Sequence, residues 1–161
     1  MVLGTPITMR LKFTKHQGDP NDFFKLLPSS WSEGLLPLWQ DYALKSEIFT
    51  LVDHGEIVAG GILVKGIPED MHLFLQESMQ WASKGYRYIG YLWVVETRRN
   101  QHLGSKWLQE LARYYPKMHF WLTIEEEPLK DFYLRNGFRM VRELQNGEAH
   151  EWLLVWDEPN K

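Results

Sequence analysis

The sequence predicts an α/β or α+β fold, in which helices cover a mixed β-sheet. Short apolar or alternating segments, bounded by turn residues, predict strands, and segments with apolar residues at helical spacing lie between them. Strands and helices alternate over most of the chain, which is typical of a sheet with helices on its faces. The 161 residues contain no internal repeat, linker or low-complexity segment, so we expect one domain over residues 1–161.

The first half of the chain reads as a strand, two helices and a hairpin. Ile7, Met9 and Phe13 alternate with other residues, as in a strand with one buried face. In the hairpin, Gly55 is expected to supply the positive φ of the turn. The expected elements are a strand over residues 6–13, a helix over 22–27 capped by Asn21, a helix over 32–44, and strands over 48–52 and 57–64.

The second half alternates helices with strands and ends in two strands. Gly85 and Gly137 follow expected helices, at the place where glycine commonly ends one, and Pro116 stops a third helix. The expected elements are helices over residues 69–84, 104–115 and 128–136, and strands over 86–95, 119–124, 138–142 and 151–156.

Composition excludes several classes of function. A net charge of -3 gives no general attraction to nucleic acid or to an anionic membrane, so we expect neither as a partner. The chain has no cysteine, which excludes disulfides, thiolate metal sites and cysteine nucleophiles, and its six histidines are scattered, so no metal is expected. No apolar run approaches a membrane span and no secretory signal is visible, so we expect a cytoplasmic protein.

Residues 92–106 form the most informative segment. An apolar strand is followed by a short basic and polar turn, and Gly104 then opens an amphipathic helix. A helix N-terminus offers unpaired backbone N–H groups and a partial positive charge, which together bind phosphate or pyrophosphate. Arg99 beside this turn adds a charge that does not titrate near neutral pH. The segment therefore predicts a site for a phosphorylated ligand.

Two motifs resemble those of the GNAT superfamily of N-acyltransferases. In the first, Arg99 and Gly104 match a pattern of Gln or Arg, two residues, Gly, one residue, and Gly or Ala, and His102 stands where the first glycine is expected. The second, residues 132–138 with the sequence Phe-Tyr-Leu-Arg-Asn-Gly-Phe, is similar to the family's closing aromatic-Tyr-x-x-x-Gly-Phe signature. The resemblance runs from about Ile48 to the C-terminus, with the segments in the family's order and spacing.

This resemblance implies a mixed, mostly antiparallel sheet with a splayed pair of parallel strands that holds acetyl coenzyme A, the acyl donor. On this sequence the pair is residues 88–95 and 119–124. Unpaired backbone groups along the first strand would bind the pantetheine amides, and an N–H near its end would stabilise the oxyanion. His102 fits the turn only if its φ is negative. The implied donor-binding residues are Leu92, Trp93, Val94, Arg99, Asn100, Gln101, His102, Leu103, Gly104, Ser105 and Lys106.

The same resemblance implies that Tyr133 is a general acid that protonates the leaving thiolate; the alternative is that Tyr133 packs in the core beside Phe132. The acceptor amine must lose a proton before it attacks. Glu96 and Glu125 follow neighbouring strands and are candidate bases, with Glu126, Glu127 and water as further candidates. The alternative is that the run of three glutamates forms only the solvated first turn of a helix.

We therefore expect an acetyl-CoA-dependent N-acetyltransferase that acts on a primary amine of a small molecule or peptide. Trp31, Trp39 and Tyr42 either line the acceptor pocket or belong to the core. A homodimer through the C-terminal strands is one option for the assembly. His102, and the glutamates where the family often has an asparagine, favour an alternative function, a catalytically degenerate domain that binds acyl-CoA as a sensor.

Overall fold

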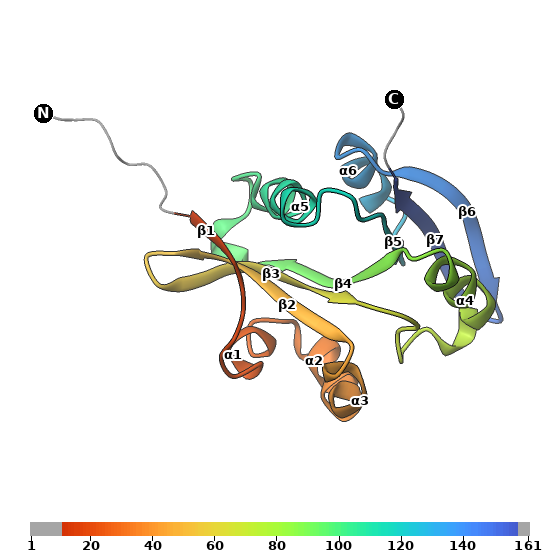
Figure 1. Cartoon of the computed structure of the whole chain (residues 1–161), viewed down its shortest axis with the longest axis horizontal. Helices are drawn as coiled ribbons and strands as arrows, with labels where there is room; N and C mark the ends of the chain where they lie inside the picture. Colours follow the sequence, from red (N-terminus) through yellow and green to blue (C-terminus); the bar gives the residue numbers. More distant parts are fainter. Residues whose placement is uncertain (1–10, 158–161) are drawn as a thin grey trace, which may run out of the picture.

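The computed structural model describes residues 11–157, which form a seven-stranded sheet with helices on both faces (Figure 1). The strands lie in the order β1-β2-β3-β4-β5-β7-β6. Their bounds are β1 (Leu11–Lys15), β2 (Ser46–Asp53), β3 (Glu56–Val64), β4 (Arg87–Val94), β5 (Phe120–Ile124), β6 (Arg139–Asn146) and β7 (Ala149–Trp156).

The helices divide the molecule into two layers around the sheet. Figure 1 shows α1, α2 and α3 below the sheet and α5 and α6 above it. Trp81 of α4 and Phe74, just before α4, share a buried cluster with Phe23 and Leu35, so α4 belongs to the lower layer. The bounds are α1 (Asn21–Phe24), α2 (Ser29–Leu35), α3 (Trp39–Ala43), α4 (Leu75–Ser83), α5 (Leu103–Tyr114) and α6 (Leu129–Arg135), with single 3-10 turns at η1 (Leu36–Leu38), η2 (His72–Phe74) and η3 (Glu96–Arg98).

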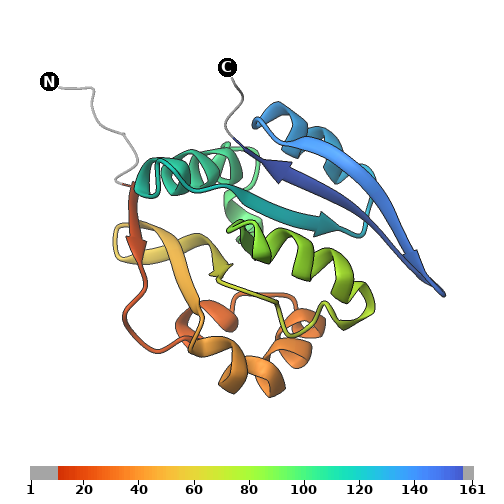
Figure 2. The same cartoon turned by 45° about the vertical axis from the view of Figure 1, so that its right-hand side comes forward.

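The sheet is mixed and mostly antiparallel, as predicted, and its one parallel pair among the described strands is β4 with β5. Only two residue pairs join these strands, Arg87 with Phe120 and Tyr88 with Trp121. Beyond them the strands separate, while β5 continues its pairing with β7 to Ile124. The edge of β4 that faces β5 is therefore left without a partner strand over residues 89–94. Figure 2 shows β5 lying instead along β7 of the C-terminal hairpin.

A β-bulge shapes this edge. Gly60 of β3 pairs with Trp93, but Ile62 pairs with Gly90, so β4 carries one more residue than β3 between these pairs. Tyr91 lies in the bulge with a φ of 58°, a left-handed conformation that L-residues other than glycine and asparagine seldom adopt. A bulge bends its strand and increases its twist, and here it lies in the part of β4 that leaves β5.

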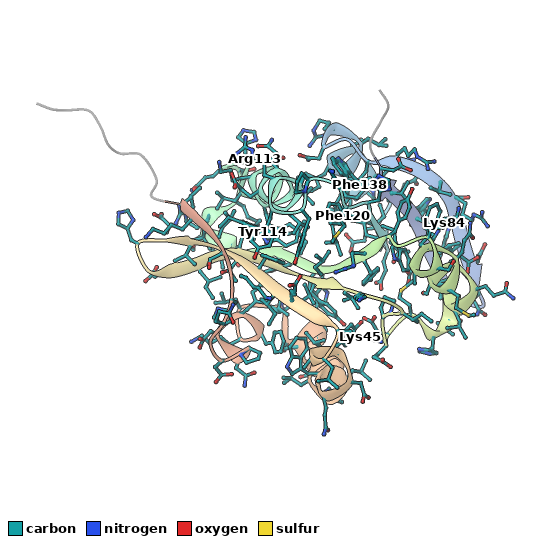
Figure 3. The ribbon with its side chains drawn as sticks, viewed as in Figure 1. Lys45, Lys84, Arg113, Tyr114, Phe120 and Phe138 are labelled. Atoms are coloured by element: carbon teal, nitrogen blue, oxygen red, sulfur yellow. The ribbon has the colours of Figure 1, made fainter. Side chains whose placement is uncertain are left out.

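Each face of the sheet has its own buried core. The upper cluster contains Leu103, Trp107 and Leu111 of α5, and the Trp107 indole donates a hydrogen bond to the Phe49 carbonyl at 3.0 Å. Phe120 and Phe138 lie between α5 and the C-terminal strands (Figure 3) and help to line a cavity of about 270 Å³ there. The helices on each face of the sheet are thus held by a separate buried core.

Several expected elements differ from the observed ones. The helix expected over residues 32–44 is three pieces, α2, η1 and α3, because Pro37 cannot donate a helical hydrogen bond. The helix expected over 69–84 begins only at residue 72, as a 3-10 turn, and α1 has Pro20 rather than Asn21 at its N-cap. Asp19 instead accepts the Asn21 amide at 2.9 Å.

The expected strand over residues 6–13 falls partly on residues 6–10, outside the described part of the chain, and β1 extends to Lys15. The last hairpin is longer than expected, because β6 continues to Asn146 and β7 begins at Ala149. Gly55 has the predicted positive φ, 85°.

Candidate active site

Helix α5 begins without a side-chain cap, so its first amides remain available to a ligand. Its N-cap residue, His102, makes no capping hydrogen bond, and the Lys106 amide is the one that bonds the His102 carbonyl, at 3.0 Å. The amides of Leu103, Gly104 and Ser105 therefore have no intrahelical acceptor. With the helix dipole behind them, amides of this kind suit an anion, and binding of one at this turn stays a prediction.

The turn before α5 takes its shape from two left-handed residues, Asn100 with a φ of 64° and His102 with a φ of 61°. The negative φ expected for His102 is therefore wrong. An L-residue in this conformation costs roughly 1–2 kcal/mol, whereas glycine adopts it freely. The backbone at position 102 thus has the conformation that suits the glycine of the family pattern, and His102 adopts it with strain.

A groove of about 430 Å³ runs along the start of α5. Gln101 and His102 line it as exposed side chains, and Ser105 and Lys106 line it half-buried. The Lys106 ammonium lies 3.1 Å from Glu110, one helical turn further along. These residues are hydrogen-bond donors and a cation around free amides, so the groove suits a phosphate-bearing ligand.

The two arginines of the turn are held by the protein itself. The guanidinium of Arg98 lies 2.9 Å from the Asp53 carboxylate and 3.0 Å from the side-chain oxygen of Gln101, which joins the turn to the β2–β3 hairpin. Arg99 donates a hydrogen bond to the Val94 carbonyl at 3.1 Å, and its guanidinium stacks 4.4 Å from the centre of the Trp93 ring. Arg99 therefore fixes the end of β4 as well as carrying charge.

The two motifs meet in the structure. A Cβ atom on Gly104 would lie 2.9 Å from the ring of Phe132, so the absence of a side chain at Gly104 lets α5 pack against α6. Leu92 and Val94 of β4 are partly buried against the same cluster, which also contains Leu103. The predicted pantetheine strand, the pyrophosphate turn and the closing helix are thus neighbours.

Tyr133 lies in this cluster and is 9% exposed. Its ring packs edge-on against Phe132 and Phe138, with centroids 4.9 and 5.3 Å away. Burial raises the pKa of its phenol well above the ordinary value, so the hydroxyl stays protonated at neutral pH. Among residues 11–157 nothing forms a hydrogen bond with this hydroxyl, which leaves it able to donate to a ligand. The ring therefore packs in the core beside Phe132, as the alternative interpretation holds, and the role of the hydroxyl as a general acid stays a prediction.

A sequence profile of the acetyltransferase (GNAT) family matches residues 19–138, which include both motifs and the splayed strand pair. The chain belongs to the GNAT acetyltransferase family. The predicted resemblance is confirmed. A search of curated proteins finds no match.

Solved structures confirm the GNAT fold. A GNAT family acetyltransferase from Elizabethkingia anophelis with acetyl-CoA bound is 16% identical, with a TM-score of 0.62 over 92% of this chain and 98% of that one. An acetyltransferase from Bacillus subtilis in complex with CoA is 15% identical, with a TM-score of 0.64 over 93% and 100%. A GNAT family protein from Desulfovibrio desulfuricans is 10% identical, with a TM-score of 0.67 over 91% and 98%. At these identities the likeness concerns the fold.

Two further properties of the GNAT chain concern residues 11–157. No helix in that range combines the length and the apolar character needed to cross a membrane. Nor do three or more His, Asp or Glu side chains in that range gather in a way that could hold a metal ion.

On the lower face of the sheet, sequence reasoning missed Asp70. The Asp70 carboxylate accepts hydrogen bonds from the hydroxyls of Tyr42, on α3, and Tyr91, in the bulge, the latter at 2.7 Å. Lys45, labelled in Figure 3, holds the same loop by donating to the Ile67 carbonyl and to Glu69. Asp70 had been placed inside an expected helix, and no local pattern marks it as a partner of residues 28 positions before it and 21 after it.

Glu151 on β7 was also missed. It alternates with the buried Leu153 and Val155, which places it on the lower face, and it lies just beyond the last β5–β7 pair. Burial raises the pKa of Glu151, the charges of Glu125 and Asp70 raise it further, and hydrogen bonding to Thr123 lowers it. We call Asp70, Glu125 and Glu151 the acidic trio. Of these, only Glu125 was predicted, from its place after the strand.

The other predicted carboxylates, like that of Glu125, are exposed. Glu96 opens η3 and is exposed, with no ion pair or side-chain hydrogen bond to a described residue. Glu127 pairs with Lys130 at 3.3 Å, and the Glu126 carbonyl accepts the Leu129 amide, so both belong to the turn that starts α6, as the alternative interpretation holds.

The aromatic residues of the early helices divide between core and surface. Trp39 packs edge-on against Phe24 and Tyr42 is fully buried, so both belong to the core. Trp31 is 37% exposed, with its ring edge-on to Tyr91 at 6.0 Å and to Trp93 at 5.2 Å. Trp31 therefore forms part of the surface beside the bulge.

Proposed function

We propose that this GNAT domain is an acetyl-CoA-dependent N-acetyltransferase that acetylates a primary amine of a small molecule or peptide. The observation that carries the proposal is the contact of Gly104 with Phe132, which joins the two motifs beside the unpaired edge of β4. In two of the similar solved structures, acetyl-CoA or CoA is bound. The donor assignment for this chain rests on that likeness together with its own free amides.

The residues present fit an acyl-CoA donor. Free amides at Leu103, Gly104 and Ser105 suit a pyrophosphate, and the groove beside them supplies the side chains of Gln101 and Lys106. The unpaired edge of β4 over residues 89–94 suits the amides of a pantetheine arm, which bind as an added strand would. Leu92, Trp93 and Val94 serve through their backbone, as the sequence predicted.

In the proposed reaction the acceptor amine first gives up a proton to a carboxylate. Glu125 is the candidate that the sequence predicted, and Glu151 is a second candidate that is more buried. Burial raises the pKa of Glu151, which makes its carboxylate a stronger base than an ordinary one. Glu96 remains a further candidate from the sequence. Nitrogen then bonds to the acetyl carbon, and the bond from that carbon to sulfur breaks. In this proposal, backbone N–H groups near Leu92 or Val94 stabilise the oxyanion.

Tyr133 then hydrogen-bonds the departing thiolate and supplies its proton. The ordinary pKa is near 10 for a phenol and near 8.5 for a thiol, and burial raises the pKa of Tyr133 further. Proton transfer from Tyr133 to the thiolate is therefore uphill by itself. It must be coupled to transfer of the second proton that the nitrogen releases. Of the two protons that the ammonium loses, one leaves through the carboxylate and the other balances the proton on the thiol. The sum is one amide, one free thiol and one proton.

Two measurements test this proposal. Acetyl-CoA should raise the unfolding temperature with increasing concentration, because it binds the folded state. Thiol release from acetyl-CoA should then depend on added amine, in a panel of diamines, aminoglycosides, amino acids and peptides. A folded protein that shows no thermal shift at millimolar acetyl-CoA would contradict the donor assignment.

A second candidate function is an acyl-CoA sensor without turnover. The observation that favours it is His102, whose strained backbone and exposed side chain replace the family's glycine at the groove. Ligand binding with no thiol release for any amine in the panel would support this alternative over the enzyme.

A further inference from the structure

We infer that Asp70 is a positioning residue for acetyl transfer. Through Tyr91 it holds the bulge of β4 in the form that turns the amides of Leu92 and Val94 toward the donor. This inference rests on the proposed function, because it concerns the step in which those amides stabilise the oxyanion. In this role Asp70 acts on the backbone of β4 and contacts neither the donor nor the acceptor.

The amides of Leu92 and Val94 point away from β3, toward the unpaired edge of β4. The Val95 amide bonds the Val58 carbonyl of β3 at 3.0 Å. Successive residues of a strand present their backbone groups to opposite edges, so the amides of Val94 and Trp93 face opposite sides, and the Leu92 amide faces the same side as that of Val94. The Val94 carbonyl agrees with this direction, because its partner is a side chain of the turn that follows the strand. The two amides are therefore free for the oxygen of a thioester.

The bulge decides which amides face that edge. Without the extra residue in β4, the pairing of Ile62 with Gly90 would place Gly60 opposite Leu92 and not opposite Trp93. Every following residue of β4 would then exchange edges, as a slip of one residue requires. The Trp93 amide would face the gap in place of its two neighbours. The proposed oxyanion site therefore depends on the bulge.

The backbone at the bulge is strained. Tyr91 has a φ of 58°, and a left-handed residue in a bulge is usually glycine. A residue with a Cβ atom is less stable in this conformation than glycine is. Such strain persists only where the surrounding structure holds it. The side chain of Tyr91 must therefore make contacts that offset the strain.

The Asp70 carboxylate makes such a contact. One of its oxygens accepts the Tyr91 hydroxyl at 2.7 Å, and the other accepts the hydroxyl of Tyr42, which is fully buried on α3. Burial and the charge of Asp70 raise the pKa of both phenols well above the ordinary value, so both stay donors at neutral pH. Lys45 fixes the loop that carries Asp70 by donating to the Ile67 carbonyl. The carboxylate thus ties the strained residue of the bulge to a buried helix.

The infrared carbonyl band of acetyl-CoA, isotope-labelled at the acetyl carbonyl, tests the inference without any acceptor. Bound to the parent protein, the band should lie at lower frequency than in the free donor, because the two amides bond the oxygen. Asp70→Ala should largely abolish this shift. Tyr91→Phe, which keeps the ring beside Trp31 and removes the hydroxyl, should do the same and covers the case in which Asp70→Ala does not fold.

Turnover should separate positioning from binding. With the amine of the panel that the parent protein acetylates fastest, both variants should lower kcat by about tenfold and leave the KM for acetyl-CoA nearly unchanged. Tyr115→Phe is the matched control, because it removes a hydroxyl from the carboxylate of Glu47 on the opposite face of the sheet. It should keep both the carbonyl shift and kcat.

Glycine at position 91 distinguishes an action through the bulge from a direct action of Asp70. Tyr91→Gly should keep the bulge, the carbonyl shift and most of kcat, because glycine adopts a left-handed φ freely. Adding Asp70→Ala to Tyr91→Gly should then change little. A further tenfold loss in that double variant, a lost shift in Tyr91→Gly, a shift that survives in Tyr91→Phe, or no shift in the parent would each overturn the inference and leave the proposed function standing. A folded parent protein that binds no acetyl-CoA would overturn both.

Discussion

The proposed donor site and the acidic trio are built in different ways. The proposed donor site is a continuous segment, residues 99–106, whose binding groups would be mostly backbone amides at the start of α5. The acidic trio and its partners come from separate elements, with Asp70 from a loop, Tyr42 from α3, Tyr91 from the bulge of β4 and Glu151 from β7. Amides are present whatever the side chain is, whereas carboxylates exist only where the sequence supplies them.

The two regions should therefore respond differently to substitution. His102 stands where the family pattern has a glycine, and its backbone is left-handed, a conformation that glycine adopts freely. In the acidic trio, each change of side chain alters the local charge. Four substitutions test this contrast.

The largest expected effect is on catalysis, where the two sides meet. Tyr133→Phe keeps the ring and its packing against Phe132 and Phe138 and removes the hydroxyl. We expect kcat to fall by about 10²-fold, the lower range for a general acid, with the thermal shift by coenzyme A unchanged. Tyr114→Phe is the matched control and should keep kcat, because this half-exposed ring lies between α5 and the sheet (Figure 3), edge-on to Phe49. Unchanged turnover in Tyr133→Phe would mean that another group protonates the thiolate.

The next largest effect should be on stability and on coenzyme A binding. Gly104→Val places a side chain against the ring of Phe132, so the start of α5 must move away from α6. Overpacking of this kind costs roughly 1–3 kcal/mol of stability and should also weaken the shift caused by coenzyme A. Gly34→Val, in an open position of α2, is the control, and chemical denaturation measures both. Undiminished coenzyme A binding by Gly104→Val would show that the helix start does not hold the donor.

A smaller effect should relieve strain in the donor turn. His102→Gly removes the cost of the left-handed backbone, and we expect a gain of about 1 kcal/mol in the free energy of unfolding. His54→Gly, also left-handed but in the hairpin, should give a similar gain. Only His102→Gly should change the affinity for coenzyme A, measured by titration calorimetry. A loss of stability in His102→Gly would mean that the histidine side chain makes a stabilising contact.

The smallest expected effect is on the pH dependence of stability, measured without ligand. The pKa of Glu151 is raised in the folded state, so the folded protein holds this proton more tightly than the unfolded chain does. Its contribution to stability is complete below the unfolded pKa and is lost as pH rises through the folded value. Glu151→Gln should therefore raise Tm, relative to the parent protein, by on the order of 1 °C more at pH 8 than at pH 4. An equal change at both pH values would mean that burial and neighbouring charges do not act on Glu151.

The sequence predicted the order of strands and helices and the two motifs, because each depends on neighbours within about one turn or one strand. It predicted one helix over residues 32–44, because the apolar spacing continues through Pro37, where the helix is in fact divided. It also placed Asp70 inside a helix, because the apolar spacing after that residue resembles a helical face. Of the acidic trio, the sequence predicted only Glu125, from the rule that ligands gather at the carboxyl ends of strands.

By itself, the sequence determined the strand–turn–helix of residues 92–106, the aromatic closing motif and the family, because these are local patterns of hydrophobicity and special residues. Only the tertiary structure decided that β4 leaves β5 after Tyr88, that Gly104 touches Phe132, and that Tyr42 and Tyr91 bond Asp70. Those contacts join residues far apart along the chain. Their energies depend on distance and burial in the folded state, which periodicity and composition do not encode.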